Sequence, residues 1–142
     1  MTRKEVKEIV EIVTNALNSV ESGCRIDVVG GYRRGKELNN DVDILIASPT
    51  SSTDHTLQSL IQKLKSTNNI TEILSVTNAS NNIQASKERT TNIVDASSKC
   101  LCAFIVAPNR IHRRVDLVVA SKPQHAFALL GWTGYISANQ LW

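Results

Sequence analysis

The feature that most limits the fold of this chain is an apolar run that contains two carboxylates one residue apart. Asp41 and Asp43 flank Val42 and are followed by three apolar residues, 44–46. Such a run is typical of a strand that is buried on both faces. Because side chains alternate along a strand, both carboxylates must point to the same face, about 5–7 Å apart. The fold must therefore place two negative charges together on a sheet.

Two like charges at this separation repel each other unless a cation lies between them. A hard divalent ion such as Mg²⁺ prefers carboxylate oxygens and leaves coordination positions for phosphate oxygens. The alternative, ordinary acids on an exposed strand, explains Asp41 and Asp43 poorly because their neighbours are apolar. We therefore predict that these two residues bind metal.

A third acid, Asp116, lies in a second apolar, β-branched run at residues 113–119. Buried carboxylates are usually paired, protonated or metal-bound. Taken alone, Asp116 would be assigned to a salt bridge with Arg113 or Arg114. Together with the first pair it predicts a two-cation site for phosphoryl transfer, in which one metal activates the attacking hydroxyl and the other binds the departing phosphates.

Three longer segments occur in order along the chain: G-G-Y-R-R-G-K-E-L-N-N-D-V-D-I-L-I-A-S-P at 30–49, H-R-R-V-D-L-V-V at 112–119 and H-A-F-A-L-L-G-W-T-G at 125–134. Together they resemble the palm of a family X DNA polymerase, closest in motif to terminal transferase, polymerase mu and fungal relatives. The first segment alone would indicate only the wider nucleotidyltransferase superfamily. The second and third segments narrow the resemblance to family X.

The resemblance implies an α+β fold, the polymerase beta-like nucleotidyltransferase palm, with a mixed sheet of about five strands and helices packed on one face. It assigns residues 1–134 to one palm domain and leaves 135–142 as an unmatched tail. It also implies that the lyase domain and the thumb of the family are missing. The chain is therefore expected to be a lone palm, which would be a fragment, a truncated gene model or a splice product, and the change of pattern after Gly134 favours read-through into unrelated sequence.

Periodicity predicts the element order α-β-β-α-β-β-β-α. The first helix is expected to begin at a capping box of Thr2 and Glu5 and to end near Gly23. Asp54 is expected to cap the second helix, and a third spans about 123–130. Strands are expected at 25–29, 42–47, 71–76, 101–106 and 114–119. Residues 77–99, rich in Asn, Ser and Thr, are expected to form a loop or a partly disordered insertion.

The resemblance also implies the roles of the acidic residues. Asp41 and Asp43 would hold two Mg²⁺ ions, for which Mn²⁺ could substitute. Asp116 would ligate the catalytic ion and help to deprotonate the primer 3′-hydroxyl. Arg114 would orient the carboxylates.

The same resemblance places the nucleotide over the glycine turn. The backbone amides of Gly30 and Gly31 would cradle the triphosphate, because glycine lets the backbone approach closely. Arg34 would neutralise the phosphates, and Arg3 aligns with a further triphosphate arginine. The alternative for Arg3 is a surface arginine near a helix start, which is common.

The G-W-T-G segment would line the sugar and base pocket through Gly131, Trp132 and Gly134. Beta-like members have an aromatic residue at the position of Gly131, so this site resembles members that discriminate poorly against ribonucleotides. The alternative is a glycine needed only for the turn. The short connection at 107–111 lacks the long loop of terminal transferase, which favours template-dependent synthesis.

Composition adds little to this picture. A chain of 142 residues is the size of one domain, and its formal charge of +3 is compatible with nucleic-acid binding without predicting it. The sequence has no apolar stretch long enough to span a bilayer and no signal peptide. Cys24, Cys100 and Cys102 lack zinc spacing and are expected to be reduced thiols.

The resemblance implies the palm of a nuclear, family X, DNA-directed DNA polymerase that works in DNA repair, such as gap filling or double-strand-break end joining. Its partners would be a primer–template or gapped DNA and a dNTP or rNTP, with no membrane. One alternative is a minimal nucleotidyltransferase that modifies a protein or an RNA end, against which the second and third segments argue. The other is a non-catalytic binding module, which the missing thumb favours for the isolated chain.

Overall fold

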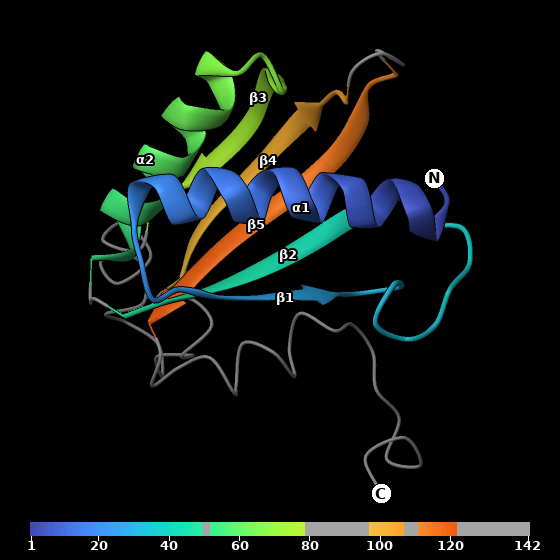
Figure 1. Ribbon diagram of the computed structural model, residues 1–142, viewed down its shortest axis with the longest axis horizontal. Helices are drawn as coiled ribbons and strands as arrows, with labels where there is room; N and C mark the ends of the chain where they lie inside the picture. The colour runs from blue at the N-terminus through green and yellow to red at the C-terminus, as the bar shows by residue number, and fades with distance from the viewer. Residues whose placement is uncertain (50–51, 79–96, 107–110, 122–142) are drawn as a thin grey trace, which may run out of the picture.

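The computed structural model describes residues 1–49, 52–78, 97–106 and 111–121. These residues form two helices and five strands, with both helices on one side of a single sheet (Figure 1). The elements are α1 (Arg3–Val20), β1 (Arg25–Val29), β2 (Asp41–Ser48), α2 (Thr53–Ser66), β3 (Ile70–Thr77), β4 (Ser98–Phe104) and β5 (Arg113–Ser121).

The sheet is mixed, with the strand order β1-β2-β5-β4-β3. The central strands β2 and β5 run parallel, and every other neighbouring pair is antiparallel. In the central pair Asp43 stands directly opposite Asp116. The α+β class and the five-stranded mixed sheet expected from the sequence are confirmed.

Helix α1 begins at the expected capping box. The Glu5 N–H donates to Thr2 Oγ1 at 3.2 Å, and the Thr2 N–H donates to Glu5 Oε1 at 3.4 Å. These bonds satisfy two of the backbone donors that a helix start leaves unpaired. The apolar stripe then faces the sheet, and burial of each large side chain stabilises the fold by about 1.5–3 kcal/mol. Its buried members are Val6, Ile9, Val13, Ala16 and Leu17.

The predicted cap of α2 is wrong. Ser52 occupies the N-cap position without a side-chain bond, and Asp54 lies in the first helical turn. The Asp54 carboxylate instead accepts a hydrogen bond from Ser98 Oγ, near the positive end of the helix dipole. Aspartate is favoured both at the cap and in the first turn, so only the contact with β4 decides between the two positions.

The core lies between the sheet and the two helices. Val42, Ile44 and Ile46 of β2 belong to this core, and they alternate with the acids. On β5, Val115 and Leu117 belong to the core and lie on either side of Asp116. Because side chains alternate, the three acids lie on the sheet face opposite to the helices.

The start of β4 also differs from expectation. The sequence predicts a strand at 101–106 and a loop at 77–99, whereas Thr77 ends β3 and Ser98 begins β4. Ser98 pairs with Val119 of β5, and this long-range pairing extends the strand into residues without local strand signal. Residues 79–96 and the helix expected at 123–130 lie outside the described residues.

The cysteines agree with the expectation of reduced thiols. Cys100 and Cys102 are buried and Cys24 is half-buried, and all three are free. In the described part of the chain, no helix has the length and apolar character needed to cross a bilayer.

Candidate active site

Three carboxylates meet at the centre of the sheet. Asp41 and Asp43 come from β2 and Asp116 comes from β5. One carboxylate oxygen of each lies within 4.8 Å of the other two. Asp116 is only 6% exposed, and the other two are half-buried. The structure thus brings together the three acids singled out in the sequence, while their role as metal ligands stays a prediction.

The cluster has an excess of negative charge. Burial, the nearby charges of Asp41 and Asp116 and a hydrogen bond with Asp116 together raise the pKa of Asp43 to about 7, and the charge of Arg114 acts in the opposite direction. Neighbouring acids that raise the pKa of a carboxyl group create a negative potential around it, and a bound cation neutralises this potential. The electrostatics therefore suit a divalent ion.

Arg114 and Asp116 form a bidentate ion pair. Arg114 Nε donates to Asp116 Oδ1 at 3.0 Å, and Arg114 Nη2 donates to Oδ2 at 3.3 Å. The hydrogen bond to Asp116 and the charge of that carboxylate raise the pKa of Arg114. Planar bidentate pairs restrict the orientation of both groups. The salt bridge that the sequence offered as the alternative for Asp116 therefore exists alongside the carboxylate cluster.

The glycine turn at residues 30–35 approaches the acids closely. Gly30 has a φ of 69°, and a Cβ at this position would lie 2.4 Å from Asp43 Oδ2. A side chain is therefore excluded both by the left-handed backbone and by the carboxylate. Two hydrogen bonds close the turn, from the Arg34 N–H to Gly30 O at 3.2 Å and from the Lys36 N–H to Gly31 O at 2.9 Å.

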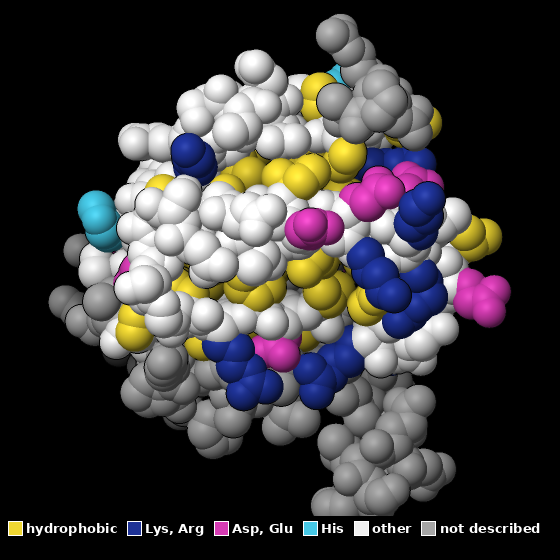
Figure 2. Space-filling view, viewed as in Figure 1, with side chains coloured by type: hydrophobic (Ala, Val, Ile, Leu, Met, Phe, Trp, Pro, Cys, Tyr) yellow, Lys and Arg dark blue, Asp and Glu magenta, His cyan; other side chains and the backbone are white. Residues whose placement is uncertain are grey.

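Basic side chains gather at the same end of the molecule. Figure 2 shows Lys and Arg side chains over the end at which α1 begins, with Asp and Glu side chains among them. An ion pair joins α1 to β5 here, because Arg113 Nη2 donates to Glu5 Oε2 at 2.7 Å. The Lys and Arg side chains at this end (Figure 2) can attract an anionic substrate.

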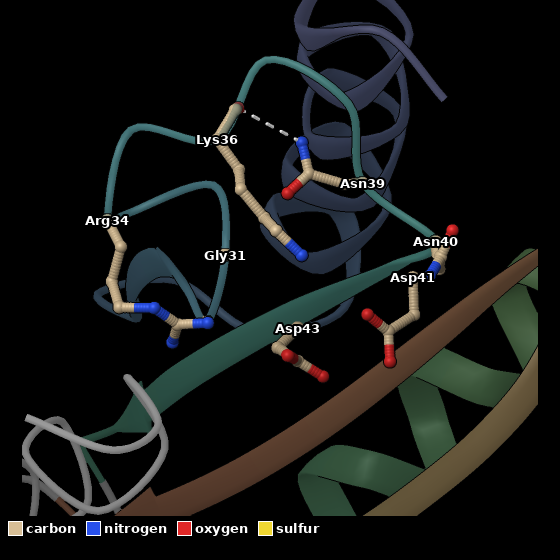
Figure 3. A pocket seen from close by; sticks show the side chains of 8 residues that line it. Gly31, Arg34, Lys36, Asn39, Asn40, Asp41 and Asp43 are labelled. Atoms are coloured by element: carbon tan, nitrogen blue, oxygen red, sulfur yellow. Dashed lines mark hydrogen bonds between the residues drawn. The ribbon is translucent and has the colours of Figure 1, made fainter.

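The turn and the start of β2 enclose a pocket of about 210 Å³. Figure 3 shows the side chains of Arg34 and Lys36 coming from the turn, and those of Asp41 and Asp43 coming from β2. A cationic wall opposite an anionic wall suits a phosphate group that is accompanied by a metal ion. The lining residues are Gly30, Gly31, Arg34, Lys36, Asn39, Asn40, Asp41 and Asp43.

Three lining residues were missed in the sequence: Lys36, Asn39 and Asn40. Lys36 continues the basic turn, and that continuation was a signal that could have identified it. Asn39 carries no such signal, because a single asparagine in a connection is ordinary. It is 4% exposed, its Nδ2 donates to Lys36 O at 3.3 Å, and its Oδ1 would lie 2.9 Å from a Cβ at Gly31.

Arg3 is not among the residues that line this pocket. Its Nη1 donates to Tyr32 O at 2.9 Å and to Lys36 O at 2.8 Å, so it holds the backbone of the turn. The remaining site residues expected from the sequence, Gly131, Trp132 and Gly134, lie outside the described residues.

Comparison with known proteins places this geometry in a family. Residues 1–122 match the family model of the DNA polymerase beta palm. The chain belongs to this family. The resemblance to a family X palm is thereby confirmed over most of the sequence, while the domain boundary at residue 134 and the tail at 135–142 stay predictions.

Several curated proteins resemble this palm over most of its length. It is 30% identical to human DNA nucleotidylexotransferase, across 94% of this chain and 29% of that protein. It is 28% identical to human DNA-directed DNA/RNA polymerase mu, across 93% of this chain and 29% of that protein. It is 29% identical to Arabidopsis thaliana DNA polymerase lambda, across 93% of this chain and 23% of that protein. The chain thus spans less than a third of the length of these relatives.

Proposed function

We propose that this palm catalyses template-directed nucleotidyl transfer, from a dNTP to the 3′-hydroxyl of a DNA primer. The observation that carries the proposal is the meeting of three carboxylates within 4.8 Å beside a pocket lined by glycine backbone and by two cations, Arg34 and Lys36. Nucleotidyl transfer needs both parts, a site for divalent ions and a cradle for phosphates.

The donor set fits Mg²⁺. The cluster offers only carboxylate oxygens, which hard cations prefer, and Mn²⁺ accepts the same ligands. Asp41 and Asp43 would hold two ions, and Asp116 would ligate one of them. When bound, the ions would supply activation of the 3′-hydroxyl and neutralisation of the phosphate charge.

The residues of the chain would bind and orient the substrates. Arg114 fixes both oxygens of Asp116, so this carboxylate would present its remaining lone pairs to the primer hydroxyl in one orientation and accept its proton. The amides of Gly30 and Gly31 would bind the triphosphate, and Arg34 and Lys36 would neutralise it. Fixed donors of this kind need little reorganisation during the reaction.

The DNA substrate is supported by the relatives, which are named as a DNA nucleotidylexotransferase and as DNA polymerases. The resemblance to family X further supports the proposal that the reaction serves gap filling or end joining in nuclear DNA repair. The second candidate is a module that binds metal and nucleotide without transferring it. The observation that favours it is that the carboxylate cluster and the neighbouring pocket by themselves account for binding of metal and phosphate.

The test is primer extension on DNA with a one-nucleotide gap, in the presence of Mg²⁺. The wild type should incorporate the nucleotide that the template specifies, and Asp116→Ala should lose at least about 10³-fold in rate, because a metal ligand and proton acceptor is removed. Glu72→Ala, which removes an exposed acid from β3, is the matched control and should keep wild-type activity.

Far-UV circular dichroism checks that each variant is folded. Activity that survives in folded Asp116→Ala would contradict the role of the carboxylate cluster. A wild type that binds Mg²⁺ and nucleotide but extends no primer would support the binding module instead.

A further inference from the structure

The start of α1 is joined to the chain that follows the glycine turn. The Asn39 N–H donates to Met1 O at 2.9 Å, and Thr2 forms an antiparallel bridge with Leu38. The segment that leads from the turn into β2 is therefore paired with the residues that precede the helix. Arg3, the first residue of α1, lies beside this pairing.

Arg3 donates hydrogen bonds to the turn at two points. Its Nη1 donates to Tyr32 O at 2.9 Å and to Lys36 O at 2.8 Å, which are carbonyls from the two halves of the turn. Its guanidinium also lies 3.7 Å from the centre of the Tyr32 ring. A guanidinium can bond in its own plane and stack through its face at the same time. One side chain thus fixes both the separation of the two carbonyls and the orientation of the tyrosine.

An ion pair with a carboxylate does not account for the position of the Arg3 side chain. Within the described ranges, no carboxylate lies within ion-pair distance of Arg3. Its acceptors are two backbone carbonyls, and these are groups whose position defines the shape of the turn. The contacts of Arg3 are therefore those of a residue that fixes the backbone conformation of the turn.

We propose that Arg3 is a positioning residue, which holds residues 30–36 in the shape that binds the triphosphate and acts through Tyr32 and Lys36 without touching the phosphates. This proposal rests on the proposed function for the identity of the ligand. The amides of Gly30 and Gly31 and the side chains of Arg34 and Lys36 all project from the same turn. Fixing that turn before the nucleotide arrives removes an ordering cost from binding.

The first test uses amide hydrogen exchange of the protein without metal or nucleotide. Arg3→Ala should accelerate exchange of the Arg34 and Lys36 amides about tenfold, since these amides donate within the turn that Arg3 holds. Arg3→Lys should give an intermediate rate, because an ammonium cannot stack as a flat guanidinium does. Lys4→Ala, which removes a neighbouring exposed cation, is the matched control and should leave both rates unchanged.

A residue that contacts only the phosphates would leave exchange in the nucleotide-free protein unchanged. Wild-type exchange rates in Arg3→Ala would therefore overturn the proposal. Arg3→Lys is measured alongside so that the comparison stands even if Arg3→Ala does not fold, and wild-type rates in Arg3→Lys would overturn it equally. This measurement needs no catalysis, so it decides the role of Arg3 even if the proposed transferase activity is wrong.

The second test is a double-mutant cycle read out by the dissociation constant of Mg²⁺–pyrophosphate. Arg3→Ala and Tyr32→Leu should each weaken binding roughly tenfold, and the double variant should be little weaker than either one, because both remove the same support. Tyr32→Phe keeps the ring and should bind as the wild type does. Effects that multiply in the double variant, or full affinity in Arg3→Lys, would indicate that Arg3 acts on the phosphates by charge and would overturn the proposal.

Discussion

At the scale of single residues, the site depends on carboxylates that repel one another and that the fold nevertheless holds close together. Asp43 is half-buried beside two other acids, and its neighbour in space, Gly30, leaves room for its carboxylate only because it has no Cβ. Arg114 compensates one acid through a bidentate pair and leaves the cluster negative as a whole. This arrangement costs stability in the protein without metal, and the cost has a measurable pH dependence.

Asp43 should make the metal-free protein less stable as the pH rises. Its pKa is about 7 in the fold, whereas a carboxyl in an unfolded chain ionises near pH ~4. Between these values the folded protein keeps a proton that the unfolded chain loses, so stability falls from about pH 4 to pH 7. Asp43→Asn cannot ionise, so in EDTA the difference between its Tm and that of the wild type should grow in favour of the variant by roughly 5–10 °C between pH 5 and pH 8.

Thermal denaturation at the two pH values measures this difference. Glu72→Gln, a change at an exposed acid of β3, should follow the wild type at both. Parallel Tm values for wild type and Asp43→Asn across the range would show that burial and neighbouring acids do not raise the pKa of Asp43.

At the scale of elements, α1 has two roles. Its apolar stripe forms one side of the core, and its first residues hold the turn that would bind phosphate. The capping box determines where the helix begins, and this start determines where Arg3 lies. A local cap therefore influences a site built mainly from other elements.

Thr2→Ala should accordingly have two effects. Loss of the cap should reduce the free energy of unfolding by about 1 kcal/mol. It should also weaken binding of Mg²⁺–pyrophosphate by a few fold, because Arg3 follows directly in the first turn. Urea denaturation and calorimetry measure the two effects, with Lys4→Ala as the control for a substitution in the same turn. Lower stability with unchanged pyrophosphate affinity would separate the cap from the turn and contradict this coupling.

At the scale of the whole molecule, the acids come from strands that are far apart in the chain and adjacent in the sheet. The parallel pairing of β2 with β5 sets Asp43 opposite Asp116, and β4 and β3 continue the sheet beyond β5. An ion held by both strands binds only the folded sheet. Ligand binding to the native state alone stabilises it by about 2.7 kcal/mol at a concentration of a hundred times the dissociation constant.

Saturating Mn²⁺ should therefore raise the Tm of the wild type by roughly 5–10 °C relative to EDTA, and Glu72→Ala should show the same shift. Asp116→Ala should lose most of it, because one of the two strands no longer provides a ligand. Differential scanning calorimetry makes the comparison. A full Mn²⁺ shift in Asp116→Ala would mean that the ion binds elsewhere.

The amino-acid sequence by itself determined the features that depend on neighbouring residues. Helical periodicity and the Thr2–Glu5 capping box predicted where α1 begins, and the alternation of acids with apolar residues predicted that Asp41 and Asp43 share a face. Caps and side-chain alternation follow from local backbone geometry, so they can be recognised without any partner. The three segments that resemble family X likewise predicted the fold class.

Only the tertiary structure decided the contacts between distant segments. The register of the central strands places Asp43 opposite Asp116. Asp54 lies in the first turn of α2, where it accepts a hydrogen bond from Ser98, and the Arg3 guanidinium stacks on the ring of Tyr32. None of these pairs has a local signal, because each residue type is compatible with several neighbours and the packing of the core selects among them. The acids could thus be named from the sequence, whereas the side chain that holds the turn beside them depended on how α1 packs.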